Sequence, residues 1–276
     1  MTGTAQFRKT IYDHYRANRR EMPWRRTRDP YRILVSEIML QQTQAARVER
    51  FYGNFIRRFP DLGALSRART PDVLRAWQGL GYNRRALALQ RLAREVVRRY
   101  QGKLPRDRAA LVALPGIGDY TAGAVRAFAW NEPEVFIETN IRRVFIHFFF
   151  PRRKKVTDAE LRRYIERTLD GRNPREWYFA LMDYGAMLGE AARQRRHSAD
   201  PNRRSARYVR QAAFSGSDRE IRGKVLRTML ERKRVPAEAL FRSFGIDRER
   251  MAAILGALAA EGFIAQRGNY LCLKNI

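Results

Sequence analysis

Residues 114–124 read Leu-Pro-Gly-Ile-Gly-Asp-Tyr-Thr-Ala-Gly-Ala. Gly116 and Gly118 permit backbone conformations and close approaches that a side chain would block. The stretch therefore predicts a tight hairpin that ends one helix and opens the next, with backbone N–H groups at the second helix free to hold a phosphate. Two glycines in a turn also fit an ordinary connection between helices, so this hairpin by itself predicts helical structure and not a function.

The chain around the hairpin has the periodicity of helices. Residues 7–190 carry apolar side chains at helical spacing, short turns with proline or glycine separate these runs, and strand-like alternation is scarce. Thr70 and Thr157 each stand before an amphipathic run and are predicted to cap helices. We therefore expect an all-α fold for this part of the chain.

The remainder divides into a linker and a small domain. Residues 191–217 are polar and rich in arginine, which predicts a basic linker suited to lie along a phosphate backbone. Beyond it, residues 218–276 predict three helices, at 221–232, 237–244 and 248–261, followed by two short strands around the turn Arg267-Gly268-Asn269. This order resembles a winged-helix domain, so the expected division is 1–190, 191–217 and 218–276.

Composition restricts the classes of function. The 276 residues carry a formal net charge of +28, spread along the chain, which favours binding to nucleic acid. The lone cysteine, Cys272, excludes an intrachain disulfide and a cysteine-rich metal cluster. The most apolar run, 144–150, is too short to span a bilayer, so we expect a cytoplasmic protein with no membrane partner. His14, His147 and His197 lack the spacing of metal ligands, and we expect no metal site.

One carboxylate has an unusual setting. Residues 34–44 read Leu-Val-Ser-Glu-Ile-Met-Leu-Gln-Gln-Thr-Gln. On a helix, Val35, Ile38 and Met39 would surround much of Glu37, and burial would raise the pKa of that carboxyl toward the range of a general acid. The alternative is an ordinary exposed glutamate on an amphipathic helix.

Four motifs together resemble one family. They are Pro23-Trp24-Arg25, Ser36 to Thr43, Trp77-Gln78-Gly79-Leu80-Gly81-Tyr82, and Leu114 to Ala124. Their order and spacing are similar to those of the helix-hairpin-helix DNA glycosylases, and within that superfamily to the adenine-specific, MutY-like branch. The resemblance covers residues 7–190. It implies two helical subdomains flanking a DNA cleft, a monomer, and a partner that is double-stranded DNA with a mismatched or damaged base.

The resemblance also implies catalytic residues. Breaking an N-glycosidic bond in DNA needs an extruded base, an acid for the leaving base and negative charge near the sugar. Glu37 is implied to protonate the purine and to help organise water. The second carboxylate is implied in Glu138-Thr139-Asn140, where the family usually has Asp-Gly-Asn, and Asn140 is implied to hold its geometry. Glutamate reaches about 1.5 Å further than aspartate, and misplacement by roughly 1 Å costs about 100-fold in rate. Glu138 alternatively serves only as a helix cap.

Tyr120 separates two reaction types. Relatives that also cut the DNA backbone place a lysine at this position as a Schiff-base nucleophile, and a phenol cannot form an imine. The resemblance therefore implies a monofunctional glycosylase with little or no lyase activity.

Recognition residues follow from the same resemblance. Gln41, Gln42 and Tyr82 are implied to wedge into the duplex and to replace the flipped base. Arg25 is a candidate for lining the base pocket, whereas Trp24 and Trp77 are better explained as core residues. The remaining implied DNA contacts are Thr43, Leu114, Gly116, Ile117 and Gly118, and the hairpin carbonyls are also candidates for binding a monovalent cation.

Two family features are missing. The family commonly carries four cysteines that bind an iron-sulfur cluster after the catalytic domain, and this chain has Gly189 where the first would fall, so we expect no cluster and no other cofactor. The linker, with Arg203 and Arg204, is a candidate substitute for the cluster loop. The family's module for inspecting 8-oxoguanine is replaced by the winged-helix-like piece.

Three functions remain open from the sequence. The first is removal of adenine opposite guanine or 8-oxoguanine. The second is removal of thymine or uracil opposite guanine, because related enzymes do this with a tyrosine at the position of Tyr120. The third, of another class, is a non-catalytic DNA-binding or regulatory protein, against which the presence of Glu37, Tyr120 and Asn140 argues.

Overall fold

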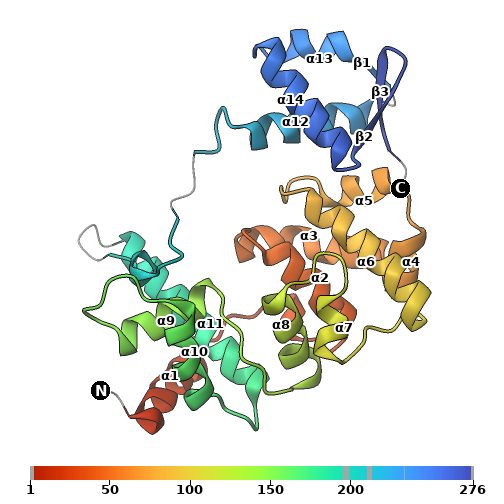
Figure 1. Ribbon diagram of the computed structural model, residues 1–276. Helices are drawn as coiled ribbons and strands as arrows, with labels where there is room; N and C mark the ends of the chain where they lie inside the picture. The colour runs from red at the N-terminus through yellow and green to blue at the C-terminus, as the bar shows by residue number, and fades with distance from the viewer. Residues whose placement is uncertain (1–2, 195–198, 210–212, 233, 275–276) are drawn as a thin grey trace. The chain divides into compact units, whose positions relative to one another are not determined.

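The computed structural model describes residues 3–194, 199–209, 213–232 and 234–274. This part of the chain is mostly helical, as the sequence predicts (Figure 1), and it divides into two compact units. The first unit consists of Met1–Glu37, Arg106–Ala113 and Ile117–Arg210, and the second of Ile38–Pro105, Leu114–Gly116 and Gln211–Ile276. Within the described residues, no helix is both long and apolar enough to cross a membrane.

The first unit is built around two closely packed helices. Its elements are α1 (Thr4–Asn18), η1 (Pro23–Arg25), the first part of α2 (Pro30–Leu40), α7 (Arg108–Val112), α8 (Asp119–Trp130), α9 (Thr139–Phe149), α10 (Asp158–Thr168), α11 (Pro174–Gln194) and η2 (Pro201–Arg204). Helices α9 and α11 lie side by side (Figure 1). A Cβ atom at Gly185 of α11 would lie only 2.4 Å from the backbone oxygen of Asn140, so a glycine is needed there. The Phe7 ring packs against Phe145 and Trp177 at centroid distances of 5.3 and 5.8 Å.

The predicted hairpin is present between α7 and α8. Helix α7 ends at Val112, and α8 begins at Asp119 with Gly118 as its N-cap. Gly116 has a φ of +80°, in the left-handed region that favours glycine. The turn therefore places Tyr120 in the first turn of α8.

The second unit holds the helices that follow α2. They are α3 (Ala45–Arg58), α4 (Leu62–Arg67), α5 (Thr70–Trp77) and α6 (Arg84–Tyr100). Trp77 is fully buried, packs edge-on against Phe55 at 5.7 Å, and donates from Nε1 to the Gly81 carbonyl at 3.1 Å. Its burial, and the 5% exposure of Trp24 in the first unit, fit the predicted core roles.

One predicted helix cap is right and one is wrong. Thr157 forms a capping box with Glu160 at the start of α10. Thr70, in contrast, lies inside α5, whose N-cap is Arg69. The Thr70 hydroxyl instead donates to Oε1 of buried Gln90 at 3.1 Å, because a buried amide on α6 needs a partner more than the exposed helix end does.

The C-terminal residues form three helices and a small sheet. They are α12 (Asp218–Glu231), β1 (Val235–Pro236), α13 (Ala237–Ser243), α14 (Arg248–Ala260), β2 (Ile264–Arg267) and β3 (Tyr270–Leu273). The helices and the hairpin lie where the sequence predicts them. The structure adds β1, which pairs antiparallel with β3 to give the order β1-β3-β2. Apolar residues of this region are buried, including Val225 of α12, Leu258 of α14 and Phe263 before β2.

Candidate active site

Glu37 is a buried carboxyl group. It lies in α2, whose first turn is capped by Asp29 through the N–H of Tyr31 at 2.8 Å. Its neighbours Val35, Ile38 and Met39 are buried, and Glu37 itself is only 3% exposed, so it is not a solvated surface glutamate. Burial raises the pKa of Glu37 to about 7. The carboxyl is therefore available as an acid near neutral pH.

Tyr120 is the direct partner of Glu37. Its hydroxyl donates to Oε2 of Glu37 at 2.5 Å. Burial, and the negative charges of Glu37 and Glu138, raise the pKa of the Tyr120 phenol well above its usual value, so the phenol keeps its proton. The Tyr120 ring packs edge-on against Phe136 at 5.7 Å, which fixes the direction of the hydroxyl. The hydrogen bond opposes the effect of burial and lowers the pKa of Glu37.

Glu138 caps a helix and belongs to the same site. It is the N-cap of α9, and its Oε1 accepts from the Ile141 N–H at 2.7 Å. Its Oε2 accepts from Nδ2 of Asn140 at 3.3 Å. The charge of Glu138 raises the pKa of Glu37, and burial raises the pKa of Glu138 itself. Because the two oxygens have separate partners, the capping role and a charge-stabilising role are compatible.

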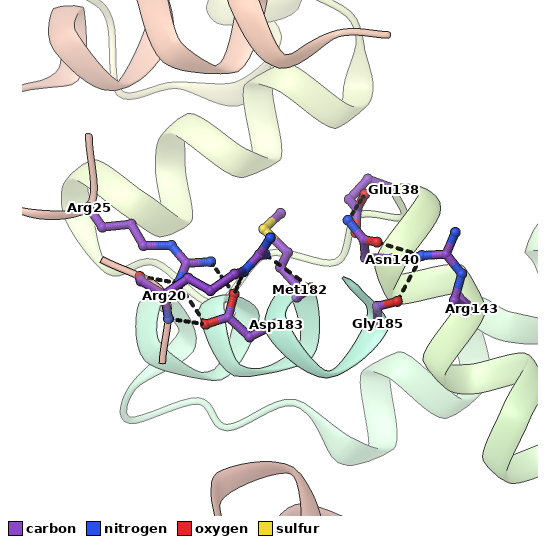
Figure 2. A network of polar contacts seen from close by, with 8 residues as sticks. All are labelled: Arg20, Arg25, Glu138, Asn140, Arg143, Met182, Asp183 and Gly185. Carbon is purple, nitrogen blue, oxygen red and sulfur yellow. Dashed lines mark hydrogen bonds and ion pairs between the residues drawn. The ribbon is translucent and has the colours of Figure 1, made fainter. Parts of the chain in front are cut away.

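Arg25 is held by a buried ion pair. Its Nη1 and Nη2 donate to Oδ2 and Oδ1 of Asp183, each at 2.8 Å, and Nε of Arg20 donates to the same carboxylate at 2.6 Å (Figure 2). Asp183 is 2% exposed. Although burial opposes ionisation, these arginines hold the pKa of Asp183 below its usual value. Arg25 therefore ties η1 to α11, and its positive charge lowers the pKa of Glu37.

The candidate wedge residues lie in two short loops of the second unit. Gln42 has a φ of 55° and Tyr82 a φ of 47°, both in the left-handed region that is costly for residues other than glycine. Both side chains are exposed. Backbone strain of this kind persists only where the surroundings hold it in place.

Arg85 supplies that support, and the sequence does not reveal it. Its guanidinium donates to the carbonyls of Ile38 and Met39 at the end of α2, and it also donates to both loops. In the first loop the acceptors are the Gln41 carbonyl and the Thr43 hydroxyl, and in the second they are the carbonyls of Leu80 and Gly81. It also lies over the rings of Trp77 and Tyr82, 5.4 Å from each centroid. Burial lowers the pKa of Arg85 to about 10, so it stays charged at neutral pH. In the sequence, Arg85 is marked only by its place next to the apolar residues Ala86, Leu87 and Leu89, and this place does not indicate which groups it contacts.

The predicted residues are divided between the units. The first unit holds Glu37, Tyr120, Glu138, Asn140, Arg25, Ile117 and Gly118, and the second holds Gln41, Gln42, Thr43, Tyr82, Leu114 and Gly116. Leu114 and Ile117 are 2% and 6% exposed, so their side chains are buried in the hairpin. Among the described residues, no group of three or more His, Cys, Asp or Glu side chains could hold a metal ion.

The chain is similar to known proteins in both sequence and fold. The family described as HhH-GPD superfamily base excision DNA repair protein matches residues 35–168. The chain is 37% identical over 227 residues to an adenine DNA glycosylase of Mycobacterium tuberculosis, covering 77% of this chain and 74% of that protein. It is 36% identical over 187 residues to a thymine/uracil-DNA glycosylase of Pyrobaculum aerophilum, covering 65% and 81%. A solved structure of a thermostable thymine-DNA glycosylase superposes with a TM-score of 0.61 at 30% identity, covering 67% of this chain and 86% of that one.

Proposed function

The chain belongs to the HhH-GPD superfamily of base excision DNA repair proteins and is a DNA glycosylase, and within this class we propose that it hydrolytically removes adenine opposite guanine or 8-oxoguanine. The observation that carries the proposal is the buried Glu37, with a pKa of about 7 and the Tyr120 hydroxyl as partner. A purine leaves readily only when a ring nitrogen is protonated, and an acid with this pKa is about half protonated at neutral pH.

The second carboxylate, Glu138, stabilises the positive charge that develops on the sugar. In its ionised form, Glu138 supplies negative charge toward an oxocarbenium-like transition state. Asn140 donates to Oε2 of Glu138 and stabilises the charged form, while the Ile141 N–H fixes Oε1. Glu37 thus supplies the proton and Glu138 the charge, and the two roles match their different partners.

We propose hydrolysis without cleavage of the DNA backbone. Tyr120 stands where a lysine nucleophile would be needed, its phenol keeps its proton, and its hydroxyl is engaged with Glu37. Efficient trapping of a covalent protein–DNA adduct by borohydride would contradict this part of the proposal. We further propose that the protein works on duplex DNA as a cytoplasmic monomer, without an iron-sulfur cluster.

Removal of thymine or uracil opposite guanine is the second candidate. The relative from Pyrobaculum aerophilum, a thymine/uracil-DNA glycosylase, is nearly as similar as the adenine glycosylases. Glu138 in place of the family's usual aspartate also leaves room for a retuned pocket.

A panel of duplexes tests both candidates. Each duplex holds adenine, thymine, uracil or hypoxanthine opposite guanine or 8-oxoguanine, and base release is read by alkaline strand cleavage. We expect adenine release that is lost in Glu37→Gln. Release of thymine or uracil alone would favour the second candidate, and no release from any duplex would favour a non-catalytic DNA-binding protein.

A further inference from the structure

The residues after α11 do not fit an iron-sulfur cluster. The chain has one cysteine, Cys272, and it lies in β3. At Gly189, where the resemblance places the first cluster ligand, a Cβ atom would lie 2.7 Å from Cζ and 2.8 Å from Nη1 of Arg143. A cysteine side chain could not be placed there without moving that guanidinium. No step of the reaction is therefore assigned to a cluster.

A carboxylate holds the guanidinium that fills this space. Arg143 of α9 is 8% exposed, and its Nε and Nη2 donate to Oδ1 and Oδ2 of Asp200 at 2.8 and 3.1 Å. Its Nη1 donates to the Gly185 carbonyl at 2.8 Å. Although burial opposes ionisation, the hydrogen bond from Arg143 holds the pKa of Asp200 below its usual value. The pair is thus charged and bidentate.

The far side of Arg143 faces the candidate catalytic residues. Its Nη1 also donates to Oδ1 of Asn140 at 2.6 Å. A guanidinium can only donate, so the oxygen of the Asn140 amide must face Arg143. The NH₂ group of that amide is then turned toward Oε2 of Glu138, as Figure 2 shows. The orientation of Asn140 therefore depends on the position of Arg143.

Asp200 has anchors of its own. It accepts from the Asn202 N–H at 2.9 Å, and Nδ2 of Asn202 donates to the Thr139 carbonyl at 3.0 Å. Further along, the Val156 N–H donates to the Arg204 carbonyl at 2.7 Å. Residues 199–206, predicted as part of a linker, are thus built into the first unit. The Arg204 guanidinium donates to the Phe150 carbonyl at 2.7 Å.

We propose that Asp200 is a positioning residue that acts, through Arg143, on the amide of Asn140 and so on the carboxylate of Glu138. The proposal rests on the proposed function. The residues present do not fit a cluster, and the Arg143–Asp200 ion pair instead fixes the segment after α11 to α9, the helix that carries Asn140.

The first test compares two carboxylates that pair with neighbouring arginines of α9. Asp200→Asn removes the charge but keeps the shape of the side chain. Its matched control is Asp158→Asn, because Asp158 accepts from Nε and Nη2 of Arg142 at 2.9 and 3.0 Å. In single-turnover base release we expect Asp200→Asn to be slower by about 10- to 100-fold, the scale of a roughly 1 Å misplacement, with unchanged affinity for duplex. We expect Asp158→Asn to stay within about twofold of wild type, and Asp200→Glu to recover part of the loss.

The second test asks whether the effect runs through Asn140. In an Asn140→Ala background, Asp200→Asn should cause no further loss, because residues that act through one another are not additive. Gly189→Ala should reproduce the slow rate with Asp200 intact, because the added Cβ displaces Arg143. Equal rates for Asp200→Asn and wild type, equal losses for Asp200→Asn and Asp158→Asn, or additive losses with Asn140→Ala would each overturn the inference. If the wild-type protein released no base from any duplex, the proposed function would be wrong, and this inference would be wrong with it.

Discussion

The Tyr120 hydroxyl lies 2.5 Å from Oε2 of Glu37, so an acid on α2 and a phenol on α8 share one hydrogen bond inside the first unit. Burial alone would raise the pKa of Glu37 further. A carboxyl with a very high pKa is a poor general acid, because it does not readily donate its proton. The Tyr120 bond and the charge of Arg25 oppose burial and leave the pKa near 7.

Tyr120→Phe tests this balance through the pH dependence of base release. The phenol stabilises the ionised form of Glu37, so its removal raises the pKa of Glu37 above about 7. If protonated Glu37 is the acid, the rate falls as pH rises through that pKa. The high-pH limb should therefore move upward, by about one pH unit for one hydrogen bond. A limb that stays in place, or moves down, would show that protonated Glu37 does not control the rate.

Glu37→Gln is expected to abolish base release and to stabilise the fold above pH 7. The pKa of Glu37 is about 7 in the folded state against a model value of 4.5, so the folded protein binds more protons between these values. Stability from this group is then lost as pH rises from about 4.5 to about 7, by about 3 kcal/mol in all.

Urea unfolding at pH 5 and pH 8 checks that expectation. The free energy of unfolding of Glu37→Gln should exceed that of wild type at pH 8 and be close to it at pH 5, because glutamine cannot ionise but can still accept from Tyr120. A variant that is less stable than wild type at pH 8 would contradict the assigned pKa.

Two substitutions separate the helix-capping role of Glu138 from the role of its negative charge. Glu138→Gln keeps an oxygen for the Ile141 N–H but removes the charge, so base release should fall at least about 100-fold with little change in unfolding free energy. Glu138→Ala removes both and should cost about 1 kcal/mol of stability in addition, as for other helix caps. If Glu138→Gln releases base at the wild-type rate, the residue is only a cap.

Gln42→Gly should uncouple stability from activity. The left-handed conformation of Gln42, with a φ of 55°, costs about 1 kcal/mol that glycine does not pay. We therefore expect no loss of thermal stability but slower base release, if the Gln42 amide is the group that wedges into the duplex. Gln101→Gly is the matched control, since Gln101 has a φ of 53° at the end of α6. The Gln101→Gly variant should release base at the wild-type rate. Equal losses of rate in both variants would show that Gln42 has no specific role in binding DNA.

Local sequence carried enough information for the hairpin, whereas for Glu37 it left burial and an exposed position on an amphipathic helix both open. Gly116 and Gly118 permit the tight turn within five residues, and the apolar neighbours of Glu37 lie on the same helix. Signals of this kind act over one or two turns, so no folded chain is needed to interpret them. The C-terminal helices and hairpin were predictable for the same reason.

The supporting ion pairs were not predictable, because their partners are far apart in the chain. Arg25 and Asp183 are separated by 158 residues, and Arg143 and Asp200 by 57. No regular spacing in the sequence links the members of either pair. In a chain so rich in arginine, a buried arginine cannot be told by its sequence pattern from a solvated surface arginine. The same holds for β1, whose two residues gain their strand character only from pairing with β3.

Arg85→Lys tests whether one side chain holds both wedge loops. Lysine has three rotatable donors where arginine has a fixed fork of five, so several of the loop carbonyls that Arg85 satisfies would lose their partner. Each buried carbonyl left unpaired costs about 1–3 kcal/mol, and we expect a loss of several kcal/mol in unfolding free energy together with weaker binding to mismatched duplex. Arg94→Lys is the control on the same helix, because Arg94 donates from Nε to a single carbonyl, that of Ser66, at 3.1 Å. Hydrogen exchange adds a local measure: the amides of Thr43 and Leu80, which donate to the carbonyls of Leu40 and Trp77, should lose protection in Arg85→Lys and keep it in Arg94→Lys. Unchanged protection in both would mean that the strained conformations of Gln42 and Tyr82 are held by something other than Arg85.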